Sequence, residues 1–325
     1  MPHALVSIII PSFNAAATLA ETIQSCLDQE HDDFEIIVVD DGSTDDSVAV
    51  AEAMAASDAR VRWFVNDGKG QSAARNFGMD QAQGNYVKFL DADDCLSADV
   101  LREQVACLEG RPQALAFCTW AHFQRSPGDH ASNAQPTDRS HTSVDGFLAE
   151  LWFDNMYPPH AWLIPVALLS DEMRWDESLT QNEDGEFFAR LIATARELRF
   201  TAGTAFYRKP VEGHVSQGVG SQHMRSQLHV LWSYQRVCAG FGDVPHLLEA
   251  YQHQVCCVAY RAATTMEEMS HLPESLDLID THHRARRFEF PSNAMNAVSR
   301  CVGIRNAFYF RSWMTRLQHL LSRAA

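Results

Sequence analysis

The chain has 325 residues, of which 46% are hydrophobic and 21% charged, and this composition is ordinary for a folded globular protein. The length allows one large domain or two. No apolar run approaches the roughly 20 residues that a membrane-spanning helix needs, and the N-terminus lacks the basic start of a signal peptide. We therefore expect a protein that is made and kept in the cytoplasm.

The formal net charge of −16 is unevenly distributed along the chain. Residues 284–325 contain eight arginines and one acid, so the preceding residues are more acidic than the total indicates. An acidic body argues against nucleic acid as the main partner. The eight cysteines form no Cys-x-x-Cys pair, which argues against a zinc ribbon or a thioredoxin motif and favours buried, reduced thiols.

The first third of the chain alternates between apolar runs and amphipathic segments. Apolar runs rich in β-branched or aromatic residues, typical of buried parallel strands, occur at residues 6–10, 34–39, 61–65 and 86–90. Between them, helices are predicted after a capping box at Thr18–Glu21 and over residues 72–83, where Gly84 is placed to cap the helix end. This alternation predicts right-handed βαβ units and an α/β fold.

Three polar clusters directly follow predicted strands, at residues 12–14, 40–43 and 91–94. Open parallel sheets bind ligands beyond the carboxyl ends of their strands, so we expect these clusters to lie close together. The third cluster, Asp91-Ala92-Asp93-Asp94, favours a hard divalent cation and, through it, a diphosphate. Residues 67–76 add flexible backbone and the cations Lys69 and Arg75, which suit a phosphate.

Other nucleotide-binding patterns do not occur in the sequence. No Gly-x-Gly-x-x-Gly follows the first strand, which argues against a dinucleotide site, and the chain has no Walker-type loop. Residues 124–143 are rich in small and polar residues and predict a long mobile loop. From about residue 222 onward the chain predicts mostly helices.

Four successive blocks, residues 6–14, 35–45, 73–78 and 89–94, strongly resemble glycosyltransferase family 2. The resemblance covers roughly residues 5–210 and implies the GT-A fold, a Rossmann-like, mostly parallel sheet with flanking helices, plus a mostly helical C-terminal region. We expect a catalytic domain over residues 1–221, in which 1–120 bind the nucleotide sugar and 121–221 bind the acceptor, and a helical region over 222–325.

The resemblance also implies roles in the donor site. Asp40 would bind the base by a hydrogen bond, and the nucleobase pocket as a whole would be formed by Pro11, Phe13, Asn14, Asp40, Asp41, Gly42 and Ser43. Arg75 would lie near the phosphates, with Lys69 as a second candidate. Asp91 would contact the ribose or the metal, and Asp93 would bind the metal directly. The implied cofactor is Mg²⁺ or Mn²⁺, whose other ligands come from the diphosphate and water.

A fifth block, residues 183–191, resembles the family's Glu-Asp motif in the acceptor site. A sugar hydroxyl must lose a proton as it attacks the anomeric carbon, and one carboxylate can accept that proton. We assign Asp184 as this base and Glu183 as its neighbour in the acceptor site. A purely structural interpretation is that these acids favour the helix dipole, with Asn182 as a cap. A single base implies inversion at the anomeric carbon.

Two further residues have open interpretations. His214 lies near the place where the family often has a His or Ser cluster, and it is either a third metal or phosphate contact or a structural histidine. Trp162 either walls the acceptor site by stacking on a sugar face or belongs to the core.

The last residues of the chain predict a basic amphipathic helix. Its apolar face consists of Phe310, Trp313, Met314, Leu317, Leu320 and Leu321. Such a helix either rests on an anionic membrane surface or packs on the catalytic body or a second subunit.

The sequence therefore predicts a metal-dependent, inverting glycosyltransferase that transfers a sugar, from a UDP-sugar, to a glycan or lipid-linked acceptor in surface polysaccharide synthesis. It would act in the cytoplasm or at the inner face of the membrane. One alternative is a silent nucleotide-sugar-binding module, against which the intact Asp93 and Asp184 argue. Another is a nucleotidyltransferase, whose Gly-rich loop is replaced here by residues 11–14.

Overall fold

The computed structural model describes residues 5–66, 69–209, 220–265, 267–279, 290, 295 and 304–324. The chain divides into two compact units. The first comprises Met1–Phe147, Asn155–Glu177 and Phe187–Gly213, and the second comprises Leu148–Asp154, Ser178–Glu186 and His214–Ala325. Two helices, α5 (Val144–Asp154) and α6 (Glu183–Thr194), contain residues of both units.

A nine-stranded sheet forms the centre of the first unit. In spatial order its strands are β3 (Val61–Val65), β2 (Phe34–Asp40), β1 (Val6–Ser12), β4 (Tyr86–Phe89), β8 (Trp162–Pro165), β6 (Ala114–Phe123), β9 (Glu197–Arg208) and β5 (Cys95–Leu96), and β7 (Ala131–Ser132) pairs with β6. The first four are parallel, as expected, whereas β8 is antiparallel to both of its neighbours. The sheet is therefore mixed, because its antiparallel strands come from segments without βαβ alternation.

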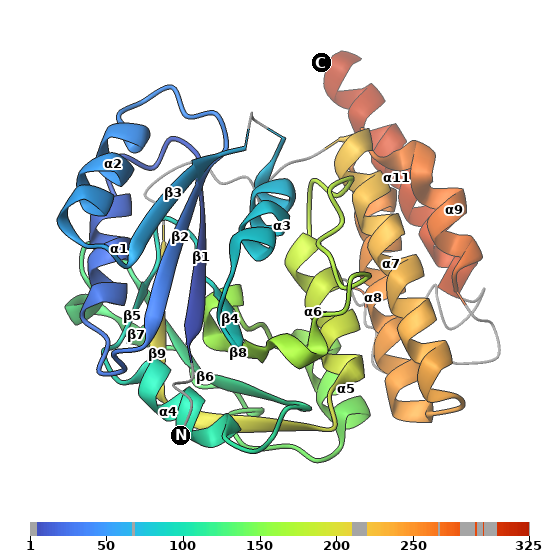
Figure 1. Ribbon diagram of the computed structural model, residues 1–325. Coiled ribbons are helices and arrows are strands. Elements are labelled where there is room, and N and C mark those ends of the chain that lie inside the picture. The colour runs from blue at the N-terminus through green and yellow to red at the C-terminus, as the bar shows by residue number, and fades with distance from the viewer. Residues whose placement is uncertain are drawn as a thin grey trace. The chain divides into compact units, whose positions relative to one another are not determined.

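Three helices connect the parallel strands: α1 (Leu19–Leu27), α2 (Ser47–Ser57) and α3 (Gln71–Gln81). Figure 1 shows α1 and α2 on one face of these strands and α3 on the other. The change of face after β3 returns the chain to β4, which pairs with β1, so the strand order reverses at this point. Open α/β sheets bind ligands beyond the strand ends at such a reversal. The three polar clusters follow β1, β2 and β4, as predicted.

The core explains why the first strands are uniformly apolar. All seven positions of β1 and of β2 are buried, because helices cover both faces of this part of the sheet. On one face α3 approaches β1 so closely that a Cβ at Gly78 would collide with the side chain of Ile9. Farther along the sheet, α4 (Val100–Leu108) packs on β6 and β9.

Three local predictions were wrong. Thr18 precedes α1, but its hydroxyl makes no cap hydrogen bond and instead donates to the carbonyl oxygen of Ala92 at 2.9 Å. Gly84 does not cap α3, which ends at Gln81; a Cβ at Gly84 would lie 2.7 Å from the carbonyl oxygen of Leu5. Residues 124–143, predicted to be a long mobile loop, contain the short 3-10 helix η1 (Pro127–Asp129) and β7, which hydrogen-bonds to β6.

Helices dominate the described part of the second unit, as predicted. They are α7 (Ser221–Phe241), α8 (Pro245–Thr264), α9 (Leu272–Asp277) and α11 (Ile304–Ala324), and α7, α9 and α11 each pack on α8. Over the residues that the structure describes, no helix has the length and apolar character needed to cross a membrane.

α11 packs on α8, but two residues of its predicted apolar face are exposed. Its residues Ala307 and Phe308 are fully buried, and the hydroxyl of Thr315 donates to the carbonyl oxygen of Ala263 at 3.1 Å. Phe310 and Trp313, which belong to the predicted face, are 43% and 55% exposed. The side chains of Leu317, Leu320 and Leu321 lie outside the described residues. The exposed aromatic residues are therefore available to another surface.

Candidate active site

Asp40, at the carboxyl end of β2, has one carboxylate oxygen engaged and one unpaired. Its Oδ2 accepts hydrogen bonds from the backbone N–H groups of Gly42 and Ser43, at 3.1 and 3.0 Å. Its Oδ1 is buried and has no hydrogen-bond partner among the described residues. Buried acceptors are nearly always hydrogen-bonded, so this oxygen can accept a hydrogen bond from a bound ligand. The arrangement fits the predicted contact with a base N–H.

The loops after β1 and β2 are tied together around this carboxylate. The N–H of Asn14 donates to Ser43 Oγ at 2.9 Å, and Asn14 Oδ1 accepts from the N–H of Thr44 at 2.8 Å. Asn14 adopts a positive φ of 50°, a conformation that asparagine tolerates better than most residues. Pro11 is buried in β1, whereas the neighbouring ring of Phe13 is 60% exposed. Phe13 thus offers an open aromatic face directly after Ser12, whose backbone pairs with that of Asp40.

Asp41 positions the loop that precedes α3. Its two oxygens accept from the side-chain amide of Asn66 at 2.9 Å and from the N–H of Gly70 at 2.8 Å. Gly70 has a φ of 100°, which side chains other than hydrogen rarely permit. Lys69 is exposed on this loop. Asp41 therefore contributes to the pocket by fixing backbone.

Arg75 links α3 to the acid tetrad. Its side chain is fully buried, and its guanidinium donates to Asp91 Oδ1 at 2.8 Å. Gln71 donates to the same oxygen at 3.0 Å. The guanidinium carbon lies 4.1 Å from the ring centroid of Trp175, which stacks on Phe187 at 4.2 Å. The structure thus pairs Arg75 with Asp91 and adds Trp175, for which the sequence contains no motif.

The acids of the tetrad differ in environment. Asp93 is exposed and Asp91 is partly buried, whereas Asp94 is almost completely buried. Burial and the neighbouring carboxylates of Asp93 and Asp91 raise the pKa of Asp94 well above its usual value. Its Oδ1 accepts from the N–H of Arg208 at 2.8 Å, and its Oδ2 lies 3.2 Å from Nδ1 of His160. Asp94 is therefore an anchor of the turn.

His160 and Lys88 form a buried polar support behind the tetrad. Burial lowers the pKa of His160 to about 3 and that of Lys88 to about 8. Lys88 donates to Gln104 Oε1 and to the carbonyl oxygens of His160 and Trp162, at 2.8 to 2.9 Å. These bonds hold the backbone at His160 and at Trp162, the first residue of β8. Neither residue was predicted. A lysine within an apolar strand and a single histidine before the next strand match no motif.

Asp91 and Asp93 fit a hard cation. Both offer carboxylate oxygens, which Mg²⁺ and Mn²⁺ prefer. Across the described ranges no group of three or more His, Cys, Asp or Glu side chains forms a complete metal site. A diphosphate and water would therefore have to supply the remaining ligands.

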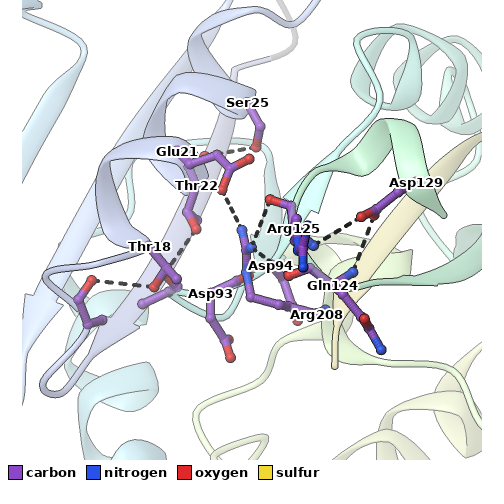
Figure 2. A network of polar contacts seen from close by, with 12 residues as sticks. Thr18, Glu21, Thr22, Ser25, Asp93, Asp94, Gln124, Arg125, Asp129 and Arg208 are labelled. Carbon is purple, nitrogen blue, oxygen red and sulfur yellow. Dashed lines mark hydrogen bonds and ion pairs between the residues drawn. The ribbon is translucent and has the colours of Figure 1, made fainter. Parts of the chain in front are cut away.

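Arg208, at the end of β9, makes contacts on several sides (Figure 2). Its guanidinium donates to the carbonyl oxygen of Asp93 at 2.7 Å and pairs with Glu21 of α1. It also lies over the ring of Phe123, 4.3 Å from the centroid. Arg208 is not among the site residues predicted from the sequence.

Asp184 and Glu183 begin α6 in residues that belong to the second unit. Both side chains are partly buried. Asn182, with a φ of 59°, precedes the helix, and its carbonyl oxygen accepts the N–H of Glu186 at 3.1 Å. Glu186 in turn accepts from Ser233 Oγ at 2.6 Å. The first turn of α6 is thus fixed by Glu186, while Asp184 and Glu183 keep their predicted roles as hypotheses.

The last two candidate residues have different outcomes. Trp162 is 1% exposed and stacks on Phe117 at 5.0 Å and on Phe188 at 5.5 Å, which favours the core interpretation over an acceptor wall. His214 lies outside the described residues.

Known proteins resemble the chain in both sequence and structure. A segment of 114 residues is 39% identical to the putative teichuronic acid biosynthesis glycosyltransferase TuaG of Bacillus subtilis. It covers 35% of this chain and 45% of that relative. A second match is the GalNAc(5)-diNAcBac-PP-undecaprenol beta-1,3-glucosyltransferase of Campylobacter jejuni, 40% identical over 30% of this chain and 32% of the relative. The matched segments thus span less than half of these relatives.

Among solved structures, S. aureus TarS 1–349 in complex with UDP-GlcNAc matches with a TM-score of 0.69 at 15% identity, over 96% of this chain and 92% of that one. The mannosyltransferase PcManGT from Pyrobaculum calidifontis, in complex with GDP-Man and Mn²⁺, matches with a TM-score of 0.55 at 15% identity, over 96% and 86%. These likenesses confirm the expected GT-A fold. Residues 7–171, just over half of the chain, match the family model described as Glycosyl transferase family 2, and the protein belongs to this family.

Proposed function

We propose that the protein transfers a sugar from a UDP-sugar to a glycan or lipid-linked acceptor with inversion at the anomeric carbon. The observation that carries this proposal is the unpaired, buried Oδ1 of Asp40 at the end of β2, together with the exposed ring of Phe13 directly after β1. Uracil presents an N–H donor between two carbonyl groups and a flat face, so it suits both features. The complex of the structural neighbour TarS with UDP-GlcNAc supports the choice of uridine.

The diphosphate would bind between α3 and the acid tetrad. Arg75 and the exposed Lys69 supply positive charge, and Asp91 and Asp93 would hold Mg²⁺ or Mn²⁺. When bound, the cation would stabilise the negative charge of the departing nucleotide diphosphate. The Mn²⁺ in the PcManGT complex supports a divalent cation on this fold. His214 stays a candidate for a further contact.

Asp184 would accept the proton of the acceptor hydroxyl as the oxygen attacks the anomeric carbon, and Glu183 would bind the acceptor beside it. One base acting in a single displacement gives inversion. We retain the functional division in which residues 1–120 bind the donor, 121–221 the acceptor, and 222–325 form a helical region.

The names of the relatives support an acceptor in surface polysaccharide or lipid-linked oligosaccharide synthesis. We propose that the protein acts in the cytoplasm, peripherally at the inner face of the membrane. The exposed Phe310 and Trp313 of α11 support this location, because α11 contains four arginines and no acid. Aromatic residues flanked by arginines favour the headgroup region of an anionic bilayer.

A thermal-shift screen of UDP-, GDP- and dTDP-sugars with Mn²⁺ tests the donor. A ligand at about 100 times its Kd stabilises the folded protein by about 2.7 kcal/mol, so the true donor raises Tm. We expect the rise with UDP-sugars and its loss in EDTA. A rise only with GDP- or dTDP-sugars would contradict the uridine assignment. Binding without metal-dependent hydrolysis or transfer would support a silent binding module instead.

A further inference from the structure

Arg208 contacts the metal-binding turn through both its backbone and its side chain. The backbone N–H donates to the buried Oδ1 of Asp94 at 2.8 Å, and Nε donates to the carbonyl oxygen of Asp93 at 2.7 Å. Asp93 is the acid with the most exposed position in the turn. Two hydrogen bonds from one residue therefore hold the carbonyl group of the proposed metal ligand and the carboxylate of the residue that follows it.

The rest of the guanidinium is engaged by other parts of the protein. One terminal nitrogen pairs with Glu21 of α1, and the other lies 3.4 and 3.5 Å from the carbonyl oxygens of Gln124 and Arg125. The guanidinium of Arg208 lies over the ring of Phe123, and the Arg208 side chain is only 12% exposed. Figure 2 shows Arg208 next to Glu21, Gln124 and Arg125. Because its donors are directed at protein oxygens, Arg208 is poorly placed to bind a phosphate.

α1 holds the other side of the same turn. The hydroxyls of Thr18 and Thr22 both donate to the carbonyl oxygen of Ala92, at 2.9 and 3.0 Å. The pair between Arg208 and Glu21 joins this helix to the end of β9. The peptide groups on either side of Asp93 are thus held from two directions, by two separate elements.

We propose that Arg208 is a positioning residue for metal binding, which orients Asp93 through the Asp93 carbonyl and the Asp94 carboxylate and is itself oriented by Glu21. This inference rests on the proposed function only in taking Asp93 as a metal ligand. Residues that orient metal ligands commonly affect metal affinity without touching the metal.

Three variants separate this role from others. Arg208→Lys keeps the positive charge but loses the Nε donor and the planar fork. Glu21→Gln keeps the shape of the partner and removes its charge. Arg62→Lys is the matched control, because Arg62 pairs with Glu35 at 2.6 Å near the amino end of β3, away from the polar clusters. UDP affinity is measured by calorimetry over a series of Mn²⁺ concentrations and in EDTA, together with Tm without ligand and with kcat and KM.

We expect Arg208→Lys to raise the Mn²⁺ concentration for half-maximal UDP binding by about 10- to 100-fold, the range typical for groups that orient metal ligands. Glu21→Gln raises it less, and Arg62→Lys leaves it unchanged. UDP affinity in EDTA stays the same in all three variants, and excess Mn²⁺ restores KM toward the wild-type value.

Each other result overturns the inference. An equal loss of UDP affinity with and without Mn²⁺ would make Arg208 a nucleotide contact. A lower Tm with unchanged Mn²⁺ dependence would make it a purely structural residue. If Arg208→Lys does not fold, an unchanged Mn²⁺ dependence in Glu21→Gln decides against the proposal. A wild-type protein without Mn²⁺-dependent UDP binding would refute the proposed function as well as this inference.

Discussion

The guanidinium of Arg75 lies on the indole ring of Trp175, with 4.1 Å between the guanidinium carbon and the ring centroid. The same group donates to Asp91, and its side chain has no solvent exposure. A desolvated cation on an aromatic face gains about 2 kcal/mol or more. Trp175 therefore stabilises a buried charge at the edge of the sheet where the proposed diphosphate binds.

Replacing Trp175 by Ala removes this support. We expect the free energy of unfolding to fall by about 3–5 kcal/mol, as for other buried tryptophans, and UDP affinity to decrease because Arg75 loses its fixed orientation. Trp175→Phe keeps an aromatic face and should retain most of the free energy of unfolding and most of the UDP affinity. Urea unfolding and calorimetry check the two effects, and unchanged UDP affinity in Trp175→Ala would limit Trp175 to core packing.

Asp93→Ala should abolish metal-dependent UDP binding in calorimetry, because the turn loses its exposed oxygen ligand. The matched control is Asp80→Asn, which removes a charge of the same kind from the far end of α3, where Asp80 pairs with Arg174 at 2.8 Å. We expect that control to bind UDP and Mn²⁺ as the wild type does. Unchanged affinity in Asp93→Ala would remove Asp93 from the metal site.

Asp184→Asn should reduce the transfer rate by about 100- to 10,000-fold, the usual contribution of a general base, while UDP affinity in Mn²⁺ is retained. Glu186→Gln is the control on the same helical turn, since its side chain accepts a hydrogen bond from Ser233 and has no proposed catalytic role. That variant should keep transfer activity at a small cost in Tm. Wild-type turnover in Asp184→Asn would exclude Asp184 as the base.

The buried Lys88 makes stability depend on pH. Burial lowers its folded-state pKa to about 8 from 10.5. Between these values the unfolded chain binds a proton that the folded protein lacks, so this group makes the free energy of unfolding increase as pH rises, by up to about 3 kcal/mol. In urea titrations at pH 7.5 to 10, the wild type should gain stability relative to Lys88→Met. A difference that stays constant with pH would contradict the assignment.

The exposed face of α11 predicts binding to anionic vesicles. Wild-type protein should float with phosphatidylglycerol vesicles at low salt and less at high salt, because arginines supply part of the attraction. The double variant Phe310→Ser, Trp313→Ser should lose this binding. Trp232→Ser is the control, since Trp232 is a 42% exposed tryptophan on α7. If the double variant instead converts a dimer to a monomer and still floats, α11 contacts a second copy.

The sequence indicates the first four strands and the residues at their ends, because these depend on local signals. Runs of β-branched and aromatic residues mark the strands; Asp40 ends β2, and Asp91 and Asp93 lie shortly after β4. The contacts that fix these acids are of a different kind. Lys88 reaches carbonyl groups 72 and 74 positions away, and Arg208 reaches Glu21 across 187 positions.

Long-range pairing also explains the wrong predictions. The hydroxyl of Thr18 has two possible partners, the start of its own helix and the carbonyl oxygen of Ala92, and only the tertiary structure brings the second within reach. The aromatic face of α11 was predicted from spacing alone, which shows that a face is apolar but not whether another element covers it. In the structure Phe310 and Trp313 of this face are exposed, whereas Ala307 and Phe308 are buried.

Gly78 has a consequence beyond packing. It lies one turn along α3 from Arg75, and the space for its missing side chain is occupied by Ile9. Any larger residue there would push α3 away from the sheet and carry Arg75 with it. A mutation at Gly78 would therefore be inherited as a defect in the proposed donor site, through the displacement of Arg75. In descendants of this protein, the tolerance for change at residue 78 should match that of the arginine itself.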